Sequence, residues 1–231
     1  MFETTRRAGV VQARSKGGRW LSTAWDGGYR EADAVYNVTV PTGFDRTDLD
    51  SYRRERLADA GFSAGPTLLT GVEMNHARLA TSDPVTVLAT AGLSNPAVLP
   101  VGDDEFREHD AGDTDPWRPG TVNLVVGATR ALDDGGLATL LGTAVEAKAA
   151  TLLSVTDAPG TTSDAVIVGC NPTTERADFA GSATTVGAAA RACVRDAILS
   201  SLRSRYDDGP PDAADAAYGV VTDRQTDVRS A

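Results

Sequence analysis

The chain has 231 residues, a length that suits one domain and leaves room for two small ones. Its 22 basic and 32 acidic residues give a net charge of −10, which argues against a broad nucleic-acid surface because phosphate binding needs clustered Lys and Arg. No apolar run reaches the roughly 18 residues of a membrane helix, and the first residues lack the apolar region of a signal peptide. We therefore expect a cytoplasmic protein with neither nucleic-acid nor membrane partners.

The charged residues are unevenly chosen. Lys16 and Lys148 are the only lysines, and aspartate outnumbers glutamate by 24 to 8. A surface rich in aspartate and poor in lysine is typical of proteins that stay soluble at high salt, where screening removes long-range repulsion. A GC-rich genome favours the same residues, so composition leaves both explanations open. We favour the halophilic one.

In the first half of the chain, short strands alternate with glycine turns. Asp26-Gly27-Gly28 is a strong turn signal between two predicted strands. A charged helix is expected at 45–60, capped by Asp45 or Thr47 and ended by Gly61. The predicted strands, including the apolar, β-branched runs further along, are 19–24, 34–40, 66–71, 85–91 and 122–128.

The second half favours helices around one buried strand. Strong helical patterns cover 134–153 and 184–205, and a buried strand at 165–169 lies between them. The acidic, turn-rich segment 101–120 is interpreted as a surface excursion.

This order of elements predicts an α/β (or α+β) fold. We expect a single-domain layer sandwich with a mixed β-sheet, N-terminal strands and two long helices in the C-terminal half. The domain covers residues 1–206. The acidic tail, 207–231, lacks a sustained apolar face and is expected to be largely disordered.

Most common catalytic signatures are absent. There is no Gly-rich phosphate loop, no dinucleotide fingerprint, no His-Glu-x-x-His and no Cys-x-x-Cys pair. The only histidines are His76 and His109, so a His-rich metal site cannot be built and a Ser-His-Asp triad would need one of the two. Cys170 follows an apolar strand, and Cys193 lies on an apolar helix face. We expect both to be reduced thiols in the core. We assign no metal ligands and no cofactor, and we leave metal dependence open.

One predicted helix carries a lysine in its apolar stripe. Residues that recur at steps of three and four define this face: Leu137, Leu141, Ala144, Lys148, Leu152 and Val155. Glu146 lies about 200° round the helix from Lys148, so the two cannot pair. A lysine among apolar neighbours needs a carboxylate from elsewhere or a snorkelling path, or must give up its proton. The pattern leaves open a structural lysine and a site lysine.

Hydroxyl groups gather at the ends of two predicted elements. Thr161, Ser163 and Asp164 lie in the turn Ala-Pro-Gly-Thr-Thr-Ser-Asp before a buried strand, where they supply donors, acceptors and a possible base. Thr184 opens the last helix, where it can cap the helix or help free N–H groups hold an anion. Taken alone, the first motif is explained by a hydrogen-bonded turn and the second by an ordinary helix cap.

Taken together and in order, these motifs resemble the adenosylcobinamide amidohydrolase family of corrinoid salvage, over about residues 21–202. The opening block has Leu21-Ser22, Gly27-Gly28 and Asn37. The later blocks are Thr-Ala-Gly-Leu-Ser-Asn up to Asn95, Gly-Thr-Val-Asn up to Asn123, the Ala-Val-Glu-Ala-Lys helix, the hydroxyl-rich turn and Gly-Ser-Ala-Thr-Thr-Val-Gly. Ordered blocks at matching spacing make the resemblance specific. With the aspartate-rich composition, it fits a protein of a halophilic archaeon.

The resemblance implies hydrolysis of the amide that links the aminopropanol arm to the corrin ring of adenosylcobinamide. The product is adenosylcobyric acid, which re-enters coenzyme B12 assembly, so the corrinoid is the substrate and not a cofactor. Amide hydrolysis needs a base, donors for the oxyanion and a proton for the leaving amine. We assign catalysis to Glu146, Asp164 and Lys148, with Asp164 or Glu146 as the base and Lys148 orienting a carboxylate or donating a proton.

Six further side chains are assigned to substrate binding: Asn37, Asn95, Asn123, Thr161, Ser163 and Thr184. Asn95, Asn123 or backbone N–H groups near Thr161 would hold the oxyanion. A hydroxyl nucleophile, Thr161 or Ser163, is the mechanistic alternative to an activated water.

Two other classes of function stay open. A cleft lined by these glycine- and threonine-rich motifs could hold a corrinoid without cutting it, which would make the chain a non-catalytic binding protein. It could also belong to an amidohydrolase or acyltransferase with another substrate. The oligomeric state is open as well, with a homodimer as one option.

Overall fold

One large mixed sheet, a two-stranded pair and three α-helices make up the described part of the chain, which covers residues 1–101, 120–213, 216 and 218–230. In chain order, the elements are β1 (Glu3–Arg7), β2 (Val10–Ser22), β3 (Gly28–Thr39), α1 (Leu49–Asp59), β4 (Thr67–Thr70), the 3-10 helix η1 (Met74–His76), β5 (Arg78–Ser82), β6 (Val85–Ala91), β7 (Ala97–Val98), β8 (Val122–Ala128), α2 (Asp134–Leu153), β9 (Ala165–Cys170), α3 (Thr185–Arg205) and β10 (Val220–Val221).

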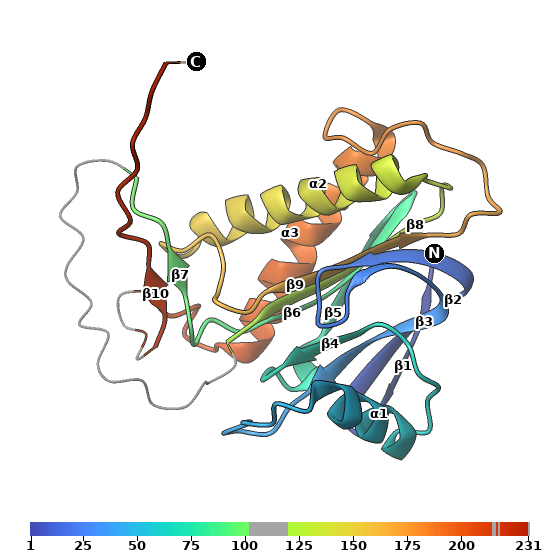
Figure 1. Cartoon of the computed structure of the whole chain (residues 1–231), viewed down its shortest axis with the longest axis horizontal. Coiled ribbons are helices and arrows are strands. Elements are labelled where there is room, and N and C mark those ends of the chain that lie inside the picture. The colour runs from blue at the N-terminus through green and yellow to red at the C-terminus, as the bar shows by residue number, and fades with distance from the viewer. Residues whose placement is uncertain (102–119, 214–215, 217, 231) are drawn as a thin grey trace.

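The large sheet mixes parallel and antiparallel neighbours. Its strand order is β4-β3-β2-β9-β8-β6-β5, and β1 pairs with β2 outside this path. β8 and β9 are parallel and are joined by α2, whereas β6 and β2 flank them in antiparallel fashion. Figure 1 shows α2 and α3 together over the sheet, with α1 beside the N-terminal strands. The predicted mixed sheet with two long helices in the C-terminal half is confirmed.

The central strands are apolar on both faces because each face meets a separate cluster. On β8, Leu124 and Val126 pack against α2 and α3, whereas Val125 packs with the N-terminal strands. Trp20, which is fully buried, lies in the second cluster with Ile167. A strand covered on both sides is an unbroken apolar run, which is the pattern that the sequence shows here.

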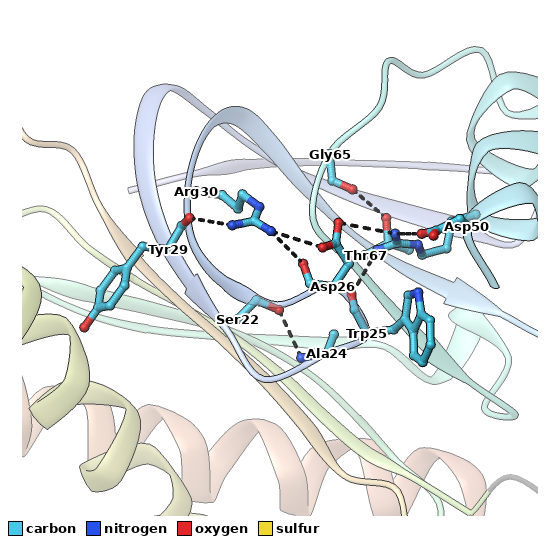
Figure 2. Close-up of polar contacts among 10 residues, drawn as sticks. Ser22, Ala24, Trp25, Asp26, Tyr29, Arg30, Asp50, Gly65 and Thr67 are labelled. Atoms are coloured by element: carbon cyan, nitrogen blue, oxygen red, sulfur yellow. Dashed lines mark hydrogen bonds and ion pairs between the residues drawn. The ribbon is translucent and has the colours of Figure 1, made fainter.

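Polar contacts hold the turn between β2 and β3 against α1 (Figure 2). Asp26 has a φ of 52° and accepts a hydrogen bond from Arg30 at 3.2 Å. Arg53 of α1 donates to the Trp25 carbonyl at 3.0 Å and pairs with Asp50. The predicted Asp-Gly-Gly turn is therefore confirmed, and α1 fixes its position.

The N-terminal part of the sheet is larger than the sequence predicts. β2 begins at Val10 and not at residue 19, and β1, which pairs with it, was not expected. Two glycines between residues 15 and 18 suggest a turn, but the pairing only shifts between Arg14 and Gly18, with Gly17 at a φ of 66°. Such an irregularity bends a strand without ending it.

Helix α1 is shorter than the predicted 45–60. Its N-cap is Asp48, so the predicted caps Asp45 and Thr47 are wrong. The Asp48 carboxylate makes no capping bond, because it accepts a hydrogen bond from Arg46 at 2.8 Å instead. Gly61 follows the helix with a φ of 73°, which is typical of a helix-ending glycine.

The predicted surface excursion at 101–120 falls almost entirely outside the described residues, and His109 falls there with it. In the tail beyond residue 207, β10 pairs in parallel with β7. Residues 222–230 follow without regular secondary structure. Part of the tail therefore adds a strand to the body of the protein.

Helix α2 is a core helix. By length and composition alone it could cross a membrane, but half of its most apolar stretch is buried inside the protein. Leu137, Leu140 and Leu152 are fully buried in the cluster between the helices and the sheet.

Cys170 and Cys193 lie in this same cluster, as predicted. Both are unpaired and buried, and burial raises the pKa of both thiols. They therefore stay protonated at neutral pH and act as small apolar side chains.

The contact between Gly169 and Trp20 gives a stability prediction. A Cβ at Gly169 would overlap the buried indole ring of Trp20, so Gly169→Ala should lower the free energy of unfolding by about 1–3 kcal/mol. Gly142, inside α2, is the matched control because a Cβ there meets nothing within 4 Å. Gly142→Ala should raise the free energy of unfolding by up to about 1 kcal/mol. Denaturant titration in high-salt buffer measures both, and equal effects would contradict the packing argument.

Candidate active site

The site is built around an ion pair between Lys148 and Asp164. Lys148 lies in the second half of α2 on the face that packs against the sheet, and Asp164 immediately precedes β9. The ammonium group donates directly to Oδ2 of the carboxylate. The two side chains are only 9% and 11% exposed. The lysine in the apolar stripe therefore has its carboxylate partner, and that partner comes from another element, not from Glu146.

Asp164 is held on both carboxylate oxygens. The backbone N–H of Val122, at the start of β8, donates to Oδ1 at 2.8 Å. The backbone N–H of Thr161 donates to Oδ2 at 3.1 Å, and the Thr161 hydroxyl is within hydrogen-bond distance of Oδ1. With Lys148, these donors fix the carboxylate at the amino ends of β8 and β9.

The Thr161 hydroxyl has two possible acceptors. Besides Asp164, the carbonyl oxygen of Gly120 lies 2.7 Å from Oγ1. A hydroxyl has one proton, so it donates to one acceptor at a time. Ser163 Oγ lies 3.4 Å from the same carbonyl. A hydroxyl beside a carboxylate is an arrangement in which the carboxylate can accept the hydroxyl proton.

Two glycines leave room for this arrangement. A Cβ on Gly160 would stand 2.6 Å from both Lys148 Nζ and Asp164 Oδ2. A Cβ on Gly120 would stand 2.5 Å from the N of Ser94 and 2.6 Å from the N of Asn95. Neither of these two N–H groups donates to a residue that the structure describes. They therefore form a candidate pair of donors beside the Thr161 turn.

Short backbone pairings tie the Thr161 turn to the tail. Asn95 O accepts from Thr162 N at 3.0 Å, and Ala97 N donates to Gly160 O at 2.9 Å. On the other side of β7, Val220 N donates to Pro96 O at 2.9 Å. The tail is thus the outer strand of a small ladder whose inner strand is the turn that holds Asp164.

Asn37 and Asn123 form a separate cluster on the opposite face of the sheet. Asn123 Nδ2 donates to Asn37 Oδ1 at 3.0 Å and to Leu69 O at 2.9 Å, and Asn37 Nδ2 donates to Thr90 Oγ1 at 2.8 Å. Asn37 and Asn123 are almost completely buried. Both N–H donors of Asn123 are therefore engaged inside this cluster, which joins the two halves of the sheet.

Glu146 and Thr184 lie away from the ion pair. Glu146 is 68% exposed on the outer face of α2 and lies 3.8 Å from Arg191. The Thr184 hydroxyl accepts from Gly187 N at 3.0 Å and so caps α3. The C-terminal part of α3 lies near the site end of the sheet, because Ala91 N donates to Ser201 Oγ there. A helix of 21 residues is about 30 Å long, so Thr184 at the other end of α3 is far from the site. The capping explanation of Thr184 is confirmed.

Sequence reasoning missed the contributions of Gly120, Gly160 and Thr90. Gly120 and Gly160 stand inside motifs that were recognised, but a sequence does not show which backbone atoms approach a glycine. The signal for Thr90 was its place in the Thr-Ala-Gly-Leu-Ser-Asn block, one residue inside the end of a strand.

Among the described residues, no group of three or more His, Cys, Asp or Glu side chains is placed to hold a metal ion. His76, the one described histidine, lies 3.0 Å from Ser204 Oγ and away from Asp164.

A family model and two known proteins that resemble this chain all carry the same name. The family model described as adenosylcobinamide amidohydrolase matches residues 1–210. A Halobacterium salinarum protein named adenosylcobinamide amidohydrolase is 52% identical over 231 residues, which cover 99% of each chain. A Methanosarcina mazei protein of the same name is 29% identical over 196 residues, which cover 80% of this chain and 90% of that one.

The close approach of Gly160 to the ion pair makes it a sharp test of the site. Gly160→Ala should displace Lys148 or Asp164 by about 1 Å and lower activity by about 100-fold, because such misplacements of reacting groups are costly. Gly181→Ala, whose nearest contact is Thr139 at 3.9 Å, is the matched control and should keep full activity. Amide hydrolysis is the measurement, with circular dichroism to check folding. Full activity in Gly160→Ala would exclude this centre.

The ladder between the tail and the Thr161 turn gives a second prediction. A chain ending at Asp208 lacks β10, and we expect it to lose about tenfold in turnover because the turn loses its outer support. A chain ending at Asp223 keeps β10 and should turn over like the full chain. The ratio of the two rates is the measurement, and equal rates would mean that the tail does not position the site.

Proposed function

Since the chain belongs to the adenosylcobinamide amidohydrolase family, we propose that it cleaves the amide between the aminopropanol arm and the corrin ring of adenosylcobinamide. The products are adenosylcobyric acid and free aminopropanol. The observation that carries the proposal is the buried Lys148–Asp164–Thr161 cluster, because it lies inside the family match and combines a carboxylate, an ammonium and a hydroxyl.

In the proposed reaction, Asp164 is the base. Its carboxylate takes a proton from the attacking water as the water oxygen bonds to the amide carbon. Lys148 and the N–H of Val122 hold the carboxylate in one orientation, so the base needs no rearrangement before reaction. Of the two carboxylates considered, Asp164 has this environment, whereas Glu146 is solvent-exposed on the outer face of α2.

The oxyanion and the leaving amine need donors of their own. The N–H groups of Ser94 and Asn95 are the proposed oxyanion donors, because they stand side by side next to Gly120 and donate to no described residue. When the tetrahedral intermediate collapses, the C–N bond breaks and the amine takes a proton from Lys148. The proton held by Asp164 then returns to Lys148, which restores both groups.

A covalent route through Thr161 is the second candidate. The hydroxyl stands between Asp164 and the Gly120 carbonyl, so the carboxylate could take its proton while Oγ1 attacks the amide. An acyl-enzyme would then be hydrolysed by water. Thr161→Ser should keep activity on this route, and Thr161→Ala should abolish it. On the water route, both variants should keep most of the activity.

Further properties belong to the same proposal. The enzyme works in the cytoplasm, takes the corrinoid as substrate without a cofactor, and has no nucleic-acid or membrane partner. The aspartate-rich surface supports a halophilic origin, so activity should need molar salt. Its relatives' names support a hydrolase over a non-catalytic corrinoid-binding protein and over an enzyme for another substrate.

The carboxylate mechanism is tested with Asp164→Asn and Glu146→Gln. Asp164→Asn removes the base and should lower turnover of adenosylcobinamide by at least about 100-fold. Glu146→Gln makes the same chemical change on the exposed face of α2 and should leave turnover unchanged. Mass spectrometry of the corrinoid, in the dark and in high salt, with and without a chelator, measures both and decides metal dependence.

The outcomes separate the function from the mechanism. If the folded wild-type chain forms no adenosylcobyric acid but binds the corrinoid, the binding-protein alternative is correct. If it forms product and Asp164→Asn does so equally fast, the function stands and Asp164 is not the base. Since removing one member of a buried ion pair costs about 3–5 kcal/mol, Asp164→Asn is compared at a salt concentration where its fold is intact.

A further inference from the structure

A cavity of about 770 Å³ lies on the N-terminal half of the molecule, on elements that do not contribute to the ion-pair site. It is open to solvent and is bordered by the turn between β1 and β2, the end of β3, helix α1 and the 3-10 helix η1. Its volume is that of a site for a small organic molecule. Val40, Pro41 and Met74 give it an apolar wall.

Three arginines line this cavity without a carboxylate partner. Arg6 and Arg7 come from β1, and Arg56 comes from α1. None of them lies within 4.0 Å of an acidic group of a described residue, although nine other arginines of the described chain do. Among the residues that the structure describes, Glu73 is the only acidic one on the lining, and it is exposed. In a chain of net charge −10, this cavity is locally positive.

The partners that the arginines do have are carbonyls and a ring. Arg6 donates to Met74 O at 3.1 Å, and Arg56 donates to Ala8 O at 2.9 Å. Arg7 lies 5.7 Å from the centroid of the Phe62 ring. These contacts hold the guanidinium groups in place without neutralising them, and each group keeps donors to spare.

A buried tyrosine hydroxyl on the same wall makes no hydrogen bond of regular geometry with a described residue. Tyr52 is 6% exposed and lines the cavity, and Arg56 is the charged group that interacts with its hydroxyl most strongly. Burial raises the pKa of Tyr52, opposed by neighbouring Arg56, so the hydroxyl keeps its proton and remains a donor. Arg56 follows one helical turn later, and its Nε is also buried and unpartnered. Leaving such groups unsatisfied is unfavourable, and an acceptor in the cavity would remove the penalty.

We propose that this cavity is a binding site for a small phosphate-bearing molecule. The arginine fork matches the geometry of phosphate oxygens, and three such forks with a phenol offer more donors than one carboxylate can accept. The cavity has room for more than the phosphate, and its apolar wall suits an organic group attached to it. The site lies apart from the proposed reaction and does not depend on it.

Calorimetric titration of the full chain with pyrophosphate, adenosine diphosphate and adenosine, at constant ionic strength, tests the proposal. The two phosphate compounds should bind at one site and adenosine should not. Removing two of the arginines, in Arg6→Gln/Arg56→Gln, should weaken binding by at least about tenfold. Arg14→Gln/Arg203→Gln removes the same charge from two exposed arginines outside the cavity and should leave affinity unchanged.

Tyr52→Phe keeps the experiment informative if the double variant fails to fold. It deletes one hydroxyl that makes no hydrogen bond of regular geometry, so the melting temperature should not fall, whereas affinity should drop by about threefold or more. Binding that is equal in all variants, or that weakens equally in the Arg14/Arg203 control, would mean only diffuse charge attraction and would overturn the proposal. So would the absence of binding to the folded wild-type chain.

Discussion

The structure of the candidate site depends on one buried ion pair. Placing Lys148 and Asp164 in a largely dry region is unfavourable for either alone, because each loses its hydration. The penalty is offset only because each finds the other and because the backbone N–H groups of Val122 and Thr161 complete the carboxylate's bonds. As a consequence, the pair ties α2, the start of β8 and the turn before β9 to one point.

The same requirement explains the glycines around the pair. The turn must bring its own N–H group to Asp164 while the lysine reaches the same oxygen, which leaves no volume for a side chain on Gly160. The tail then covers this turn from outside through β7. A cluster that must stay desolvated is thus enclosed by backbone, which brings donors without bulk.

The sequence predicted those features that depend on local pattern. The opposite placement of Glu146 and Lys148 and the strands with unbroken apolar runs are local features, and they are confirmed. The predicted apolar stripe is confirmed at Leu137, Ala144, Lys148 and Leu152, whereas Leu141 is only half-buried and Val155 lies beyond the end of α2. The partner of Lys148 could not be predicted from the helix, because Asp164 reaches it only after the chain has crossed to the parallel strand β9. Likewise, Lys-Gly-Gly after Ser15 suggests a turn, and only pairing with β3 on both sides of it shows that β2 continues through it. From the resemblance we assigned Asn37 and Asn123 to one site with Asp164, but they lie on the opposite face of the sheet. A list of motifs does not show which face of a bent sheet each strand residue occupies.

The location of the site is itself a consequence of the mixed sheet. In open parallel sheets, ligands bind at the carboxyl ends of the strands, because the connecting loops open there. Here Asp164 lies at the amino ends of β8 and β9, and antiparallel β6 and β2 flank this pair. The loops that follow β6 and β2 therefore reach the same edge, carrying Ser94 and Asn95 from one side and Thr23, bonded to Val166 O, from the other. In a fully parallel sheet, the neighbours of β8 and β9 would carry their following loops to the carboxyl ends of these strands. Here the neighbours are antiparallel, so their following loops lie at the amino ends, where the candidate active site is.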